Sequence, residues 1–505
     1  MTTSELTRTT VEAVELKELF DRQRAAFLAE GPPSAEVRRN RLDRLALALS
    51  GASDDLVAAL DADFGQRPEQ FSLVVEILSV LAAIQHARDN LEDWMQPIPV
   101  AGSAESGIPT TIDVDPKGVV GVVGPWNFPV QLVVLPAAEA IAAGNRVMIK
   151  FTDVNSRSGQ VLADAIARYF PPEELVVVNG GIDVATAFSA LPFDHLFFTG
   201  SPAVGKIVMR SAADNLTPVT LELGGKNPVV VGTDADIAES AKRIALARMI
   251  NGGQVCLCPD YVFVPTSSRD AFVEGLRATF AEYFPDYATN PNVTSIINDR
   301  NYDRVTGLID DAVAKGATAI VGVADEKAAR LPDPQTRFIA PTILLGVTDE
   351  MQVAHEEIFG PVLVVFTYDD LSEPISYITS RPSPLAAYWY GDDSAEFAEF
   401  RRKTTSGGMS RNDFAVHLSV PDVPFGGIGQ SGMGSYHGKP GFDTFSHRRA
   451  VSASELPVPT AVSLHPGGYD AKTIAGLRAA IAGAHADATA RIDHPTTTTP
   501  LEKKS

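Results

Sequence analysis

The sequence is poor in cysteine: its 505 residues include only two, Cys256 and Cys258. A disulfide between positions i and i+2 would be strained, and a redox pair normally has the spacing C-x-x-C. A structural zinc site needs about four sulfur or nitrogen ligands, usually supplied by pairs spaced C-x2-C. Here the spacing is C-x-C, there is no second pair, and no histidine lies nearby in the sequence. We therefore expect no metal site, no disulfide and a reducing, cytoplasmic location.

Positive charge is also scarce, with 42 Lys and Arg against 63 Asp and Glu and a formal net charge of −21. Phosphate backbones and anionic membrane surfaces repel such a protein, so neither nucleic acid nor a membrane is expected as a partner. Long uninterrupted apolar runs are missing too, because residues 118–136 are broken by Gly, Pro and polar side chains. The N-terminal stretch lacks the basic and apolar regions of a secretory signal.

A chain of this length is too long for one hydrophobic core, and its composition is that of a globular protein with two or three domains. Residues up to about 100 carry helical patterns. Pro33 and Ser34 predict the start of a helix that ends near Gly51, and residues 71–95 predict another. From about Gly118, short apolar runs alternate with helical patterns. This βαβ rhythm predicts a parallel sheet covered on both faces.

The two cysteines follow a glycine-rich turn in NGGQVCLCPD, residues 251–260. Free cysteine is often a small buried apolar residue, and this is the favoured interpretation of Cys258, which stands where a strand begins. Cys256 follows the turn directly, so its sulfur and backbone N–H can face a cleft. That placement suits a nucleophile, which needs an accessible thiolate and a donor for the oxyanion. From these residues alone, packing and catalysis both stay open for Cys256.

Three further motifs place polar groups next to predicted strands. Asn127, in GPWNFP, could donate to an oxyanion or stabilise a turn. Glu222, in LELGG, could be a general base of raised pKa or a solvent-facing strand residue. In FFTGSPAVG, the residues Gly200, Ser201 and Gly205 would let a pyrophosphate approach a helix N-terminus, although the G-x-G-x-x-G fingerprint is missing.

Taken in order, six motifs resemble the aldehyde dehydrogenase superfamily over roughly residues 10–455. They are GPWNFP, FTGSPAVG, LELGGKNP, GGQVC, EEIFGP and PFGGIGQSGMGSYHGKPGFDTFSH. The last motif and NGGQVCLCPDYV are most similar to the coniferyl-aldehyde and fatty-aldehyde branch, the dimeric class 3-like enzymes. The resemblance implies an α/β fold with a Rossmann-like parallel-sheet cofactor domain, a second α/β catalytic domain and a small β oligomerisation element.

The resemblance also divides the chain into parts. They are an NAD(P)-binding domain (1–100 and 117–222), a catalytic domain (223–424) and segments that bridge the subunits of a homodimer (101–116 and 425–450). Residues 451–505 would form a C-terminal tail with one helical pattern at 469–486. Its last residues, HPTTTTPLEKKS, are of low complexity and are predicted to be disordered.

By resemblance, Cys256 is the nucleophile, Glu222 is the general base and Asn127 is the oxyanion amide, which works with the backbone N–H of Cys256. The residues that the resemblance assigns to NAD or NADP are Trp126, Lys150, Asp153, Gly200, Ser201, Gly205, Leu223, Glu357 and Phe359. No metal ligand is implied.

Within the cofactor set, Lys150 would hold the adenosine ribose, and Glu357 and Phe359 would position the nicotinamide ribose and ring. One site departs from the family's usual Lys-Pro-Ser-Glu, because residues 150–153 read KFTD. Asp153 is one methylene shorter than the usual Glu. A carboxylate there binds a ribose 2′-hydroxyl and repels a 2′-phosphate, and a shorter one leaves room for the phosphate. Both NAD and NADP therefore stay open.

The implied activity is oxidation of an aldehyde to the carboxylate through a thiohemiacetal and a thioester on Cys256. The branch favours a hydrophobic aldehyde, either aromatic of the coniferyl type or aliphatic. Candidates to line its entrance are Trp126, Phe128, Val255, Asn412 and Phe414. Two alternatives remain: an acylating enzyme that passes the thioester to coenzyme A, whose relatives usually lack a base such as Glu222, and a non-catalytic binding homologue.

Overall fold

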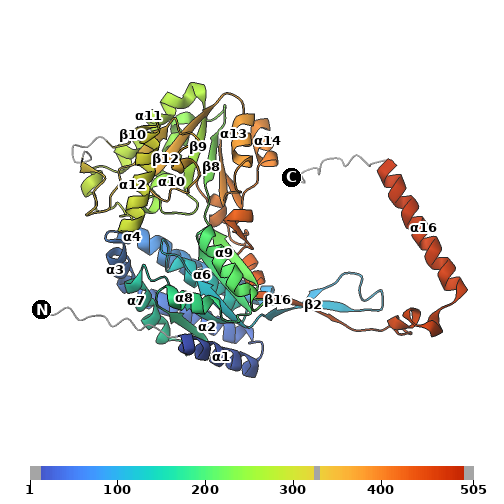
Figure 1. Ribbon diagram of the computed structural model, residues 1–505. Coiled ribbons are helices and arrows are strands. Elements are labelled where there is room, and N and C mark those ends of the chain that lie inside the picture. Colours follow the sequence, from blue (N-terminus) through green and yellow to red (C-terminus); the bar gives the residue numbers. More distant parts are fainter. Residues whose placement is uncertain (1–12, 324–329, 494–505) are drawn as a thin grey trace. The chain divides into compact units, whose positions relative to one another are not determined.

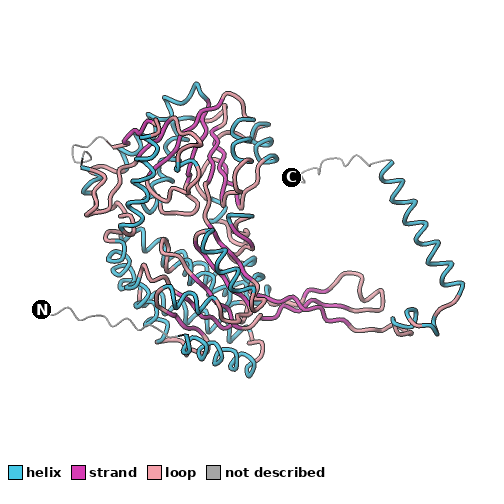
Figure 2. The backbone as a smooth tube through the Cα atoms, in the orientation of Figure 1, coloured by secondary structure: helices cyan, strands magenta, loops and turns pink. Residues whose placement is uncertain are grey.

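The computed structural model describes residues 13–323 and 330–493 (Figure 1). The described chain divides into two compact units. The larger one runs up to Gln96 and from Val114 to Arg448, and the smaller one holds Pro97–Asp113 and the residues from Arg449 onward. The predicted α/β class is confirmed, because the larger unit contains two mostly parallel sheets flanked by helices (Figure 2).

The six-stranded sheet is the predicted βαβ array, with strand order β15-β7-β6-β3-β4-β5. Its strands are β3 (Val119–Val123), β4 (Arg146–Lys150), β5 (Leu175–Val178), β6 (His195–Gly200), β7 (Val219–Leu223) and β15 (Gly432–Met433). The crossover helices are α6 (Gln131–Ala142), α7 (Ser156–Ala167), α8 (Ile182–Ser189) and α9 (Pro202–Ala213). Since β3 to β7 are parallel, their carboxyl ends meet at one edge, where such sheets bind ligands.

The seven-stranded sheet follows directly, with strand order β10-β11-β12-β9-β8-β13-β14 and only β10 antiparallel to its neighbour. Its strands are β8 (Asn227–Val231), β9 (Pro259–Pro265), β10 (Thr318–Val321), β11 (Thr342–Leu345), β12 (Val362–Tyr368), β13 (Ala386–Tyr390) and β14 (Gly408–Arg411). The accompanying helices include α10 (Ile237–Met249), α11 (Arg269–Tyr283), α12 (Asp299–Ala314), α13 (Ser372–Thr379) and α14 (Ala395–Lys403). The short link Gly224–Lys226 therefore joins the two sheets.

Helices fill the N-terminal part of the chain, as predicted. The helix α2 (Ala35–Gly51) begins after Ser34, whose side chain accepts the N–H of Val37, and it ends at the predicted glycine. Around it in sequence lie α1 (Ala13–Glu30) and α3 (Ser53–Phe64). A local capping signal therefore sets the start of α2.

The helical run Glu69–Trp94 consists of α4 (Glu69–Ser72), a π-helical segment (Leu73–Leu78) and α5 (Ser79–Trp94). By length and a mean hydropathy of 1.4, it would suffice to cross a membrane. In the structure one of its faces joins the largest core cluster, and α5 packs against α2 and α6. The π-helical segment also carries Glu76, which is fully buried. This run is therefore a core helix of the larger unit.

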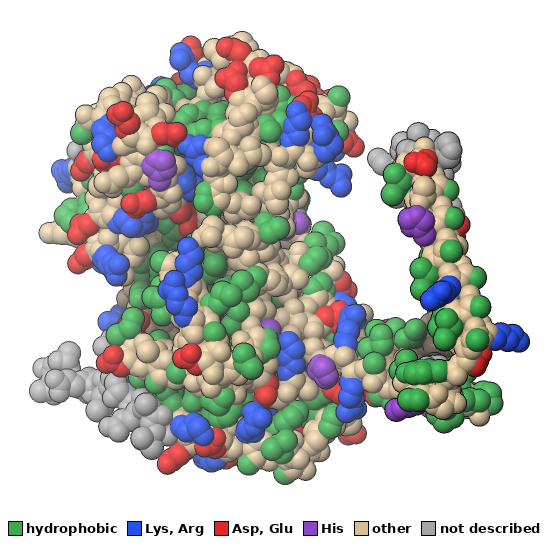
Figure 3. Space-filling view, turned by 45° about the vertical axis from the view of Figure 1, so that its right-hand side comes forward, with side chains coloured by type: hydrophobic (Ala, Val, Ile, Leu, Met, Phe, Trp, Pro, Cys, Tyr) green, Lys and Arg blue, Asp and Glu red, His purple; other side chains and the backbone are tan. Residues whose placement is uncertain are grey.

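A small sheet of order β1-β2-β16 consists of β1 (Ile98–Pro99), β2 (Thr110–Pro116) and β16 (Ser446–Ser452). The predicted helical pattern of the tail is confirmed by α16 (Ala471–Asp493). Figure 3 shows hydrophobic side chains along α16, which carries the exposed residues Ile474, Leu477 and Ile481. The end predicted to be disordered, 494–505, lies outside the described residues.

A buried ion pair lies beneath the start of α6. The side chains of Arg67 and Glu76 are each 0% exposed, and Nη2 and Oε1 are 2.8 Å apart. Glu76 Oε2 also accepts the backbone N–H groups of Val130 (3.1 Å) and Gln131 (2.8 Å). Such donors at a helix N-terminus have no partner inside the helix. The pair therefore fixes the chain just after GPWNFP.

We expect Glu76→Gln to lower the free energy of unfolding by about 3–5 kcal/mol, because it leaves Arg67 as an uncompensated buried cation. The matched control is Glu92→Gln at an exposed pair, in which Glu92 lies 2.7 Å from Arg39 and is 63% exposed. That change should cost less than about 1 kcal/mol. Urea denaturation followed by circular dichroism measures both, and equally small losses in the two variants would contradict the prediction.

Candidate active site

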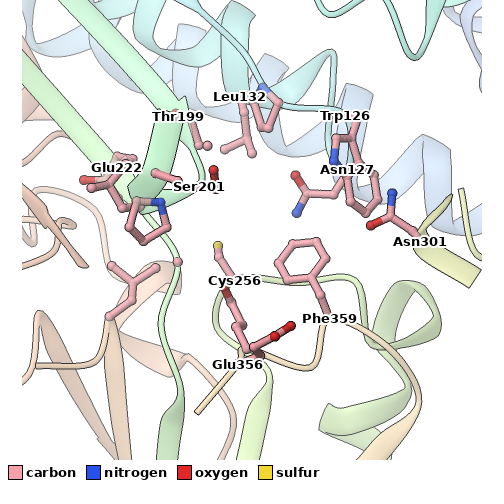
Figure 4. Close-up of a pocket in the computed structure, with 18 of the residues that line it drawn as sticks. Trp126, Asn127, Leu132, Thr199, Ser201, Glu222, Cys256, Asn301, Glu356 and Phe359 are labelled. Carbon is pink, nitrogen blue, oxygen red and sulfur yellow. The ribbon is translucent and has the colours of Figure 1, made fainter. Parts of the chain in front are cut away.

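A cavity of about 710 Å³ lies at the carboxyl ends of β6 and β7 in the larger unit (Figure 4). The predicted site residues in its wall are Trp126, Asn127, Gly200, Ser201, Glu222, Leu223, Cys256, Glu357 and Phe359. Three predicted cofactor residues, Lys150, Asp153 and Gly205, lie outside this wall. The cavity thus brings together predicted site residues that are up to 233 positions apart in the chain, from Trp126 to Phe359.

The loop before Cys256 depends on its glycines. Residues Asn251, Gly252 and Gly253 have φ of 52°, 64° and 78°, in the left-handed region. A Cβ on Gly253 would stand 2.2 Å from the carbonyl oxygen of Gly360. No side chain larger than hydrogen fits there, so the NGG sequence is needed to turn the chain from α10 toward the cavity.

Cys256 then occupies the second position of a β-turn. The N–H of Cys258 donates to the carbonyl of Val255 at 3.0 Å, which closes the turn. Cys256 is half-buried and lines the cavity, whereas Cys258 is buried and its thiol donates to the carbonyl of Ala247 at 3.3 Å. The packing interpretation of Cys258 therefore agrees with its position.

The thiol of Cys256 lies in surroundings that disfavour its charged form. Burial raises its pKa above the usual range, and the carboxyl groups of Glu357 and Glu222 raise the pKa further. The backbone N–H of Cys256 itself acts in the opposite direction. An electropositive group or a proton acceptor beside the sulfur is therefore needed before a thiolate can form at neutral pH.

Glu222 is buried at 3% exposure, so its interpretation as a solvent-facing strand residue is wrong. It lies in β7, opposite Gly432 of β15. Within the described residues, neither of its carboxylate oxygens has a hydrogen-bond partner. Burial raises its pKa well above the ordinary value. An unpartnered carboxyl group of raised pKa in a cavity can accept a proton from a bound molecule.

Asn127 connects the GPWNFP loop to the cysteine loop. Its side-chain Nδ2 donates to the carbonyl of Gln254 at 3.1 Å, and its own backbone carbonyl accepts Nδ2 of Asn251 at 3.2 Å. An amide carries two N–H groups, so a second donor remains after the first is used. Figure 4 shows the Asn127 amide and the Cys256 sulfur directed into the same space.

The N-terminus of α9 faces the cavity beside β6. Ser201 caps this helix by accepting the N–H of Val204 at 3.4 Å. The first residues of a helix carry positive partial charge and free N–H groups, which suit a phosphate. Gly205 serves packing, because a Cβ there would lie 2.7 Å from Leu223 Cδ2.

Glu357 and Phe359 form the opposite wall. Burial and the nearby Asp260 raise the pKa of Glu357 to about 8. Phe359 has a φ of 49° and meets Trp126 edge-on, with ring centroids 5.4 Å apart. The glycine at position 224 leaves room for the Glu357 side chain, because a Cβ on Gly224 would lie 2.2 Å from Glu357 Oε2.

Lys150 ends β4 at the same sheet edge as the cavity. It is buried, and Nζ donates to the carbonyls of Phe151 (2.6 Å) and Gly180 (2.7 Å). Burial lowers its pKa to about 8, against the opposing effect of Asp153. Asp153 is exposed. The two residues therefore offer a cation and an anion next to each other on the rim of the sheet.

Among the entrance candidates, only Trp126 lines this cavity. Phe128 packs near Phe71, at 6.1 Å between ring centroids, while Asn412 and Phe414 contact Gly391 and Tyr388 respectively. Val255 is buried.

Several lining residues were not predicted, among them Leu132, Thr199, Asn301, Arg304, Phe425 and Tyr436. Phe425 and Tyr436 fall inside the last motif and could have been found from it. Asn301 and Arg304 stand in an ordinary helical pattern and carry no such signal. Within residues 13–323 and 330–493, no cluster of three His, Cys, Asp or Glu side chains could hold a metal ion.

Comparisons with known proteins identify the family of this chain. The model of the Aldehyde dehydrogenase family matches residues 4–451. The chain is 44% identical to the Coniferyl aldehyde dehydrogenase of Pseudomonas sp. HR199, over 87% of this chain and 91% of the relative. It is 38% identical to the "Aldehyde dehydrogenase, dimeric NADP-preferring" of Rattus norvegicus, over 87% and 95%.

Solved structures of aldehyde dehydrogenases have a similar fold. The substrate-bound AldH of Staphylococcus aureus is 34% identical, with a TM-score of 0.85 over 92% of this chain and 99% of that one. An indole-3-acetaldehyde dehydrogenase of P. syringae, solved with NAD+, is 26% identical, with a TM-score of 0.79 over 88% and 90%. This chain therefore belongs to the aldehyde dehydrogenase family, the enzymes that oxidise an aldehyde with NAD+ or NADP+ as acceptor.

Proposed function

We propose that this enzyme oxidises a hydrophobic aldehyde, with Cys256 as nucleophile, Glu222 as general base and Asn127 as oxyanion donor. One observation supports the proposal most directly. A half-buried thiol, an unpartnered buried carboxyl group and a buried amide line one cavity. Burying such groups is costly unless they are paired or used, so their meeting here favours chemistry over packing.

In the first step the thiolate of Cys256 attacks the carbonyl carbon of the aldehyde. The oxyanion that develops is met by the second N–H of Asn127 and by the backbone N–H of Cys256. One such donor contributes about 2.7–4 kcal/mol to the stability of the transition state. The turn geometry supports this role, because the cross-turn bond uses the N–H of Cys258 and leaves that of Cys256 for the substrate.

The cavity and its rim fit a nicotinamide dinucleotide. The N-terminus of α9, with Ser201, would hold the pyrophosphate, and Lys150 and Asp153 would hold the adenosine ribose. The nicotinamide ribose and ring would lie against Glu357 and Phe359. When bound, the cofactor supplies the oxidation, since it accepts a hydride from the substrate carbon. Its positive ring would also counter the charges that keep the thiol protonated.

Gly200, Gly205, Leu223 and Trp126 complete this proposed cofactor site. Gly200 ends β6, where a Cβ would lie 2.6 Å from the ring of Phe198. Gly205 and Leu223 pack α9 onto β7, which keeps the helix N-terminus in place. Trp126 contacts Phe359 and closes the cavity on that side.

The last step is hydrolysis of the thioester on Cys256. Glu222 would take a proton from a water molecule, whose oxygen then attacks the thioester carbon. The C–S bond breaks, so Cys256 leaves as the thiolate and the carboxylate product is released. Both oxygens of Glu222 are free of protein partners in the described chain and are thus available to hold that water. The raised pKa makes the carboxylate a stronger base than an exposed glutamate.

We assign the proposed domains as the sequence predicts. The NAD(P)-binding domain comprises 1–100 and 117–222, the catalytic domain 223–424, and the segments 101–116 and 425–450 join two subunits. The name of the rat relative, which is dimeric, supports a homodimer. The scarcity of cysteine supports a cytoplasmic location.

A hydrophobic substrate is favoured by the cavity wall, which carries Trp126, Leu132, Leu385 and Phe425. The relative named Coniferyl aldehyde dehydrogenase supports an aromatic aldehyde. Glu222 disfavours the acylating alternative. In that chemistry coenzyme A takes the acyl group in place of water, so no general base would be needed to activate water. The non-catalytic alternative leaves the unpartnered carboxyl group without a reason.

We expect Glu222→Gln to keep a first-turnover burst of NAD(P)H but to lower the steady-state rate by about 100-fold or more, the usual worth of a general base. Only deprotonated Glu222 can act as a base, and its pKa is raised. The wild-type rate should therefore rise with pH through that pKa, and the variant should lose this dependence. Stopped-flow absorbance measures both phases.

Cys256→Ala is the companion variant. It should show neither burst nor turnover while still binding cofactor, as measured by calorimetry. Normal steady-state turnover of Glu222→Gln would rule out its role in deacylation, and turnover by Cys256→Ala would rule out the nucleophile.

A panel of aldehydes with NAD+ and NADP+ tests the substrate and cofactor proposals. We expect aromatic and long aliphatic aldehydes to have higher kcat/KM than propanal, and both cofactors to support turnover.

Asp153→Glu should move the preference toward NAD+ by about tenfold, because the longer carboxylate reaches the 2′-phosphate. Asp164→Glu, on the following helix α7, is the control and should leave the preference unchanged. A rise in turnover on adding coenzyme A would favour the acylating alternative instead.

A further inference from the structure

The loop that carries Cys256 is held by its backbone carbonyl groups. Each carbonyl oxygen of residues 254–259 accepts a hydrogen bond. For residues 256–258 the donors are two buried side chains, Asn227 and Tyr388, that the proposed chemistry does not use. They come from neighbouring parallel strands, β8 and β13.

Asn227 binds the carbonyl on each side of Leu257. Its Nδ2 donates to the carbonyl of Cys256 at 2.7 Å and to that of Cys258 at 3.1 Å. Its Oδ1 accepts the N–H of Ala386 at 2.9 Å. The side chain is 1% exposed and both N–H groups of its amide are used. Its orientation is therefore fixed from three directions.

Tyr388 binds the carbonyl between those two. Its hydroxyl donates to the carbonyl of Leu257 at 2.8 Å, and its side chain is 0% exposed. Two positions further along β13 stands Tyr390, which is also buried. The hydroxyl of Tyr390 has no hydrogen-bond partner within the described residues. The two tyrosines therefore share a strand and a residue type and differ in whether they bind the cysteine loop.

These bonds bear on the geometry of the turn. Cys256 and Leu257 are the central residues of the Val255–Cys258 turn. The common turn types differ by a flip of the peptide between the two central residues, whose carbonyl belongs here to Cys256. The bond from Asn227 blocks that flip. The bond from Tyr388 fixes the next peptide, so the backbone on the C-terminal side of the thiol cannot rotate.

We propose that Asn227 and Tyr388 are positioning residues that keep the sulfur and the backbone N–H of Cys256 directed into the cavity. The inference rests on the proposed role of Cys256 as nucleophile. A displacement of about 1 Å at a reacting group can cost about 100-fold in rate. Loss of either donor also leaves a buried carbonyl without a partner, which favours other conformations of the loop.

The test compares Tyr388→Phe with Tyr390→Phe, each of which removes one hydroxyl and keeps the ring. We expect the burst rate of Tyr388→Phe to fall by about tenfold, with KM for the cofactor changed less than about twofold. Tyr390→Phe should match the wild type in both. Asn227→Ser, which cannot reach both carbonyls, should lower the burst rate further. Thermal denaturation shows that each variant is folded.

A second measurement does not depend on turnover. Alkylation of Cys256 by iodoacetamide, followed by mass spectrometry across pH, reports the pKa of the thiol. If its own N–H is no longer aligned with the sulfur, the midpoint should move to higher pH in Tyr388→Phe, because that N–H lowers the pKa of the thiol. Tyr390→Phe should show the wild-type midpoint.

An unchanged burst rate and alkylation midpoint in folded Tyr388→Phe would overturn the inference, as would equal changes in the two Phe variants. Turnover by Cys256→Ala would instead refute the proposed function, while the alkylation profiles would still show whether the loop is held by Tyr388.

Discussion

The site depends on one unfavourable placement, the burial of the Glu222 carboxyl group without a hydrogen-bond partner. Water would solvate such a group, and the protein interior stabilises it mainly in its neutral form. The surrounding structure tolerates it because the group lies at a cavity, where a bound molecule can reach it. From Glu222 the chain leaves the six-stranded sheet and arrives at Asn227, which binds the cysteine loop. One short segment thus serves both the carboxyl group and the thiol.

Buried polar side chains hold the two loops of the site, the one that contains GPWNFP and the one that carries Cys256. Glu76 binds the backbone just after GPWNFP, Asn127 connects that motif to the cysteine loop, and Asn227 and Tyr388 hold the loop from the other side. Loops present reactive groups well only when a rigid scaffold limits them. Here the scaffold acts through hydrogen bonds to main-chain groups, so the side chains of the loop remain available for chemistry.

Structural features that depend only on residues close together in the sequence could be predicted. The start of α2 follows from Ser34, because side-chain capping is a local effect, and the helix ends at Gly51 as predicted. The burial of Glu222 could not be decided, since alternation along a strand does not say which face is covered. The motif predicts Gly205 beside a pyrophosphate, and it could not show that a Cβ at this position would lie 2.7 Å from Leu223 Cδ2. The sequence carries no local signal for the role of Tyr388, because its partner is a carbonyl 131 positions away.

The link Gly224–Lys226 has a consequence for how the enzyme can vary. Neither glycine of this link has φ in the left-handed region, so their small size matters for space alone. A methyl group on Gly224 would strike the Glu357 carboxylate. The same three residues separate β7, which carries Glu222, from β8, whose Asn227 binds the cysteine loop. Substitutions in this link would therefore affect Glu222, the cysteine loop and Glu357 together, so we expect the link to tolerate few changes when substrate preference is redesigned.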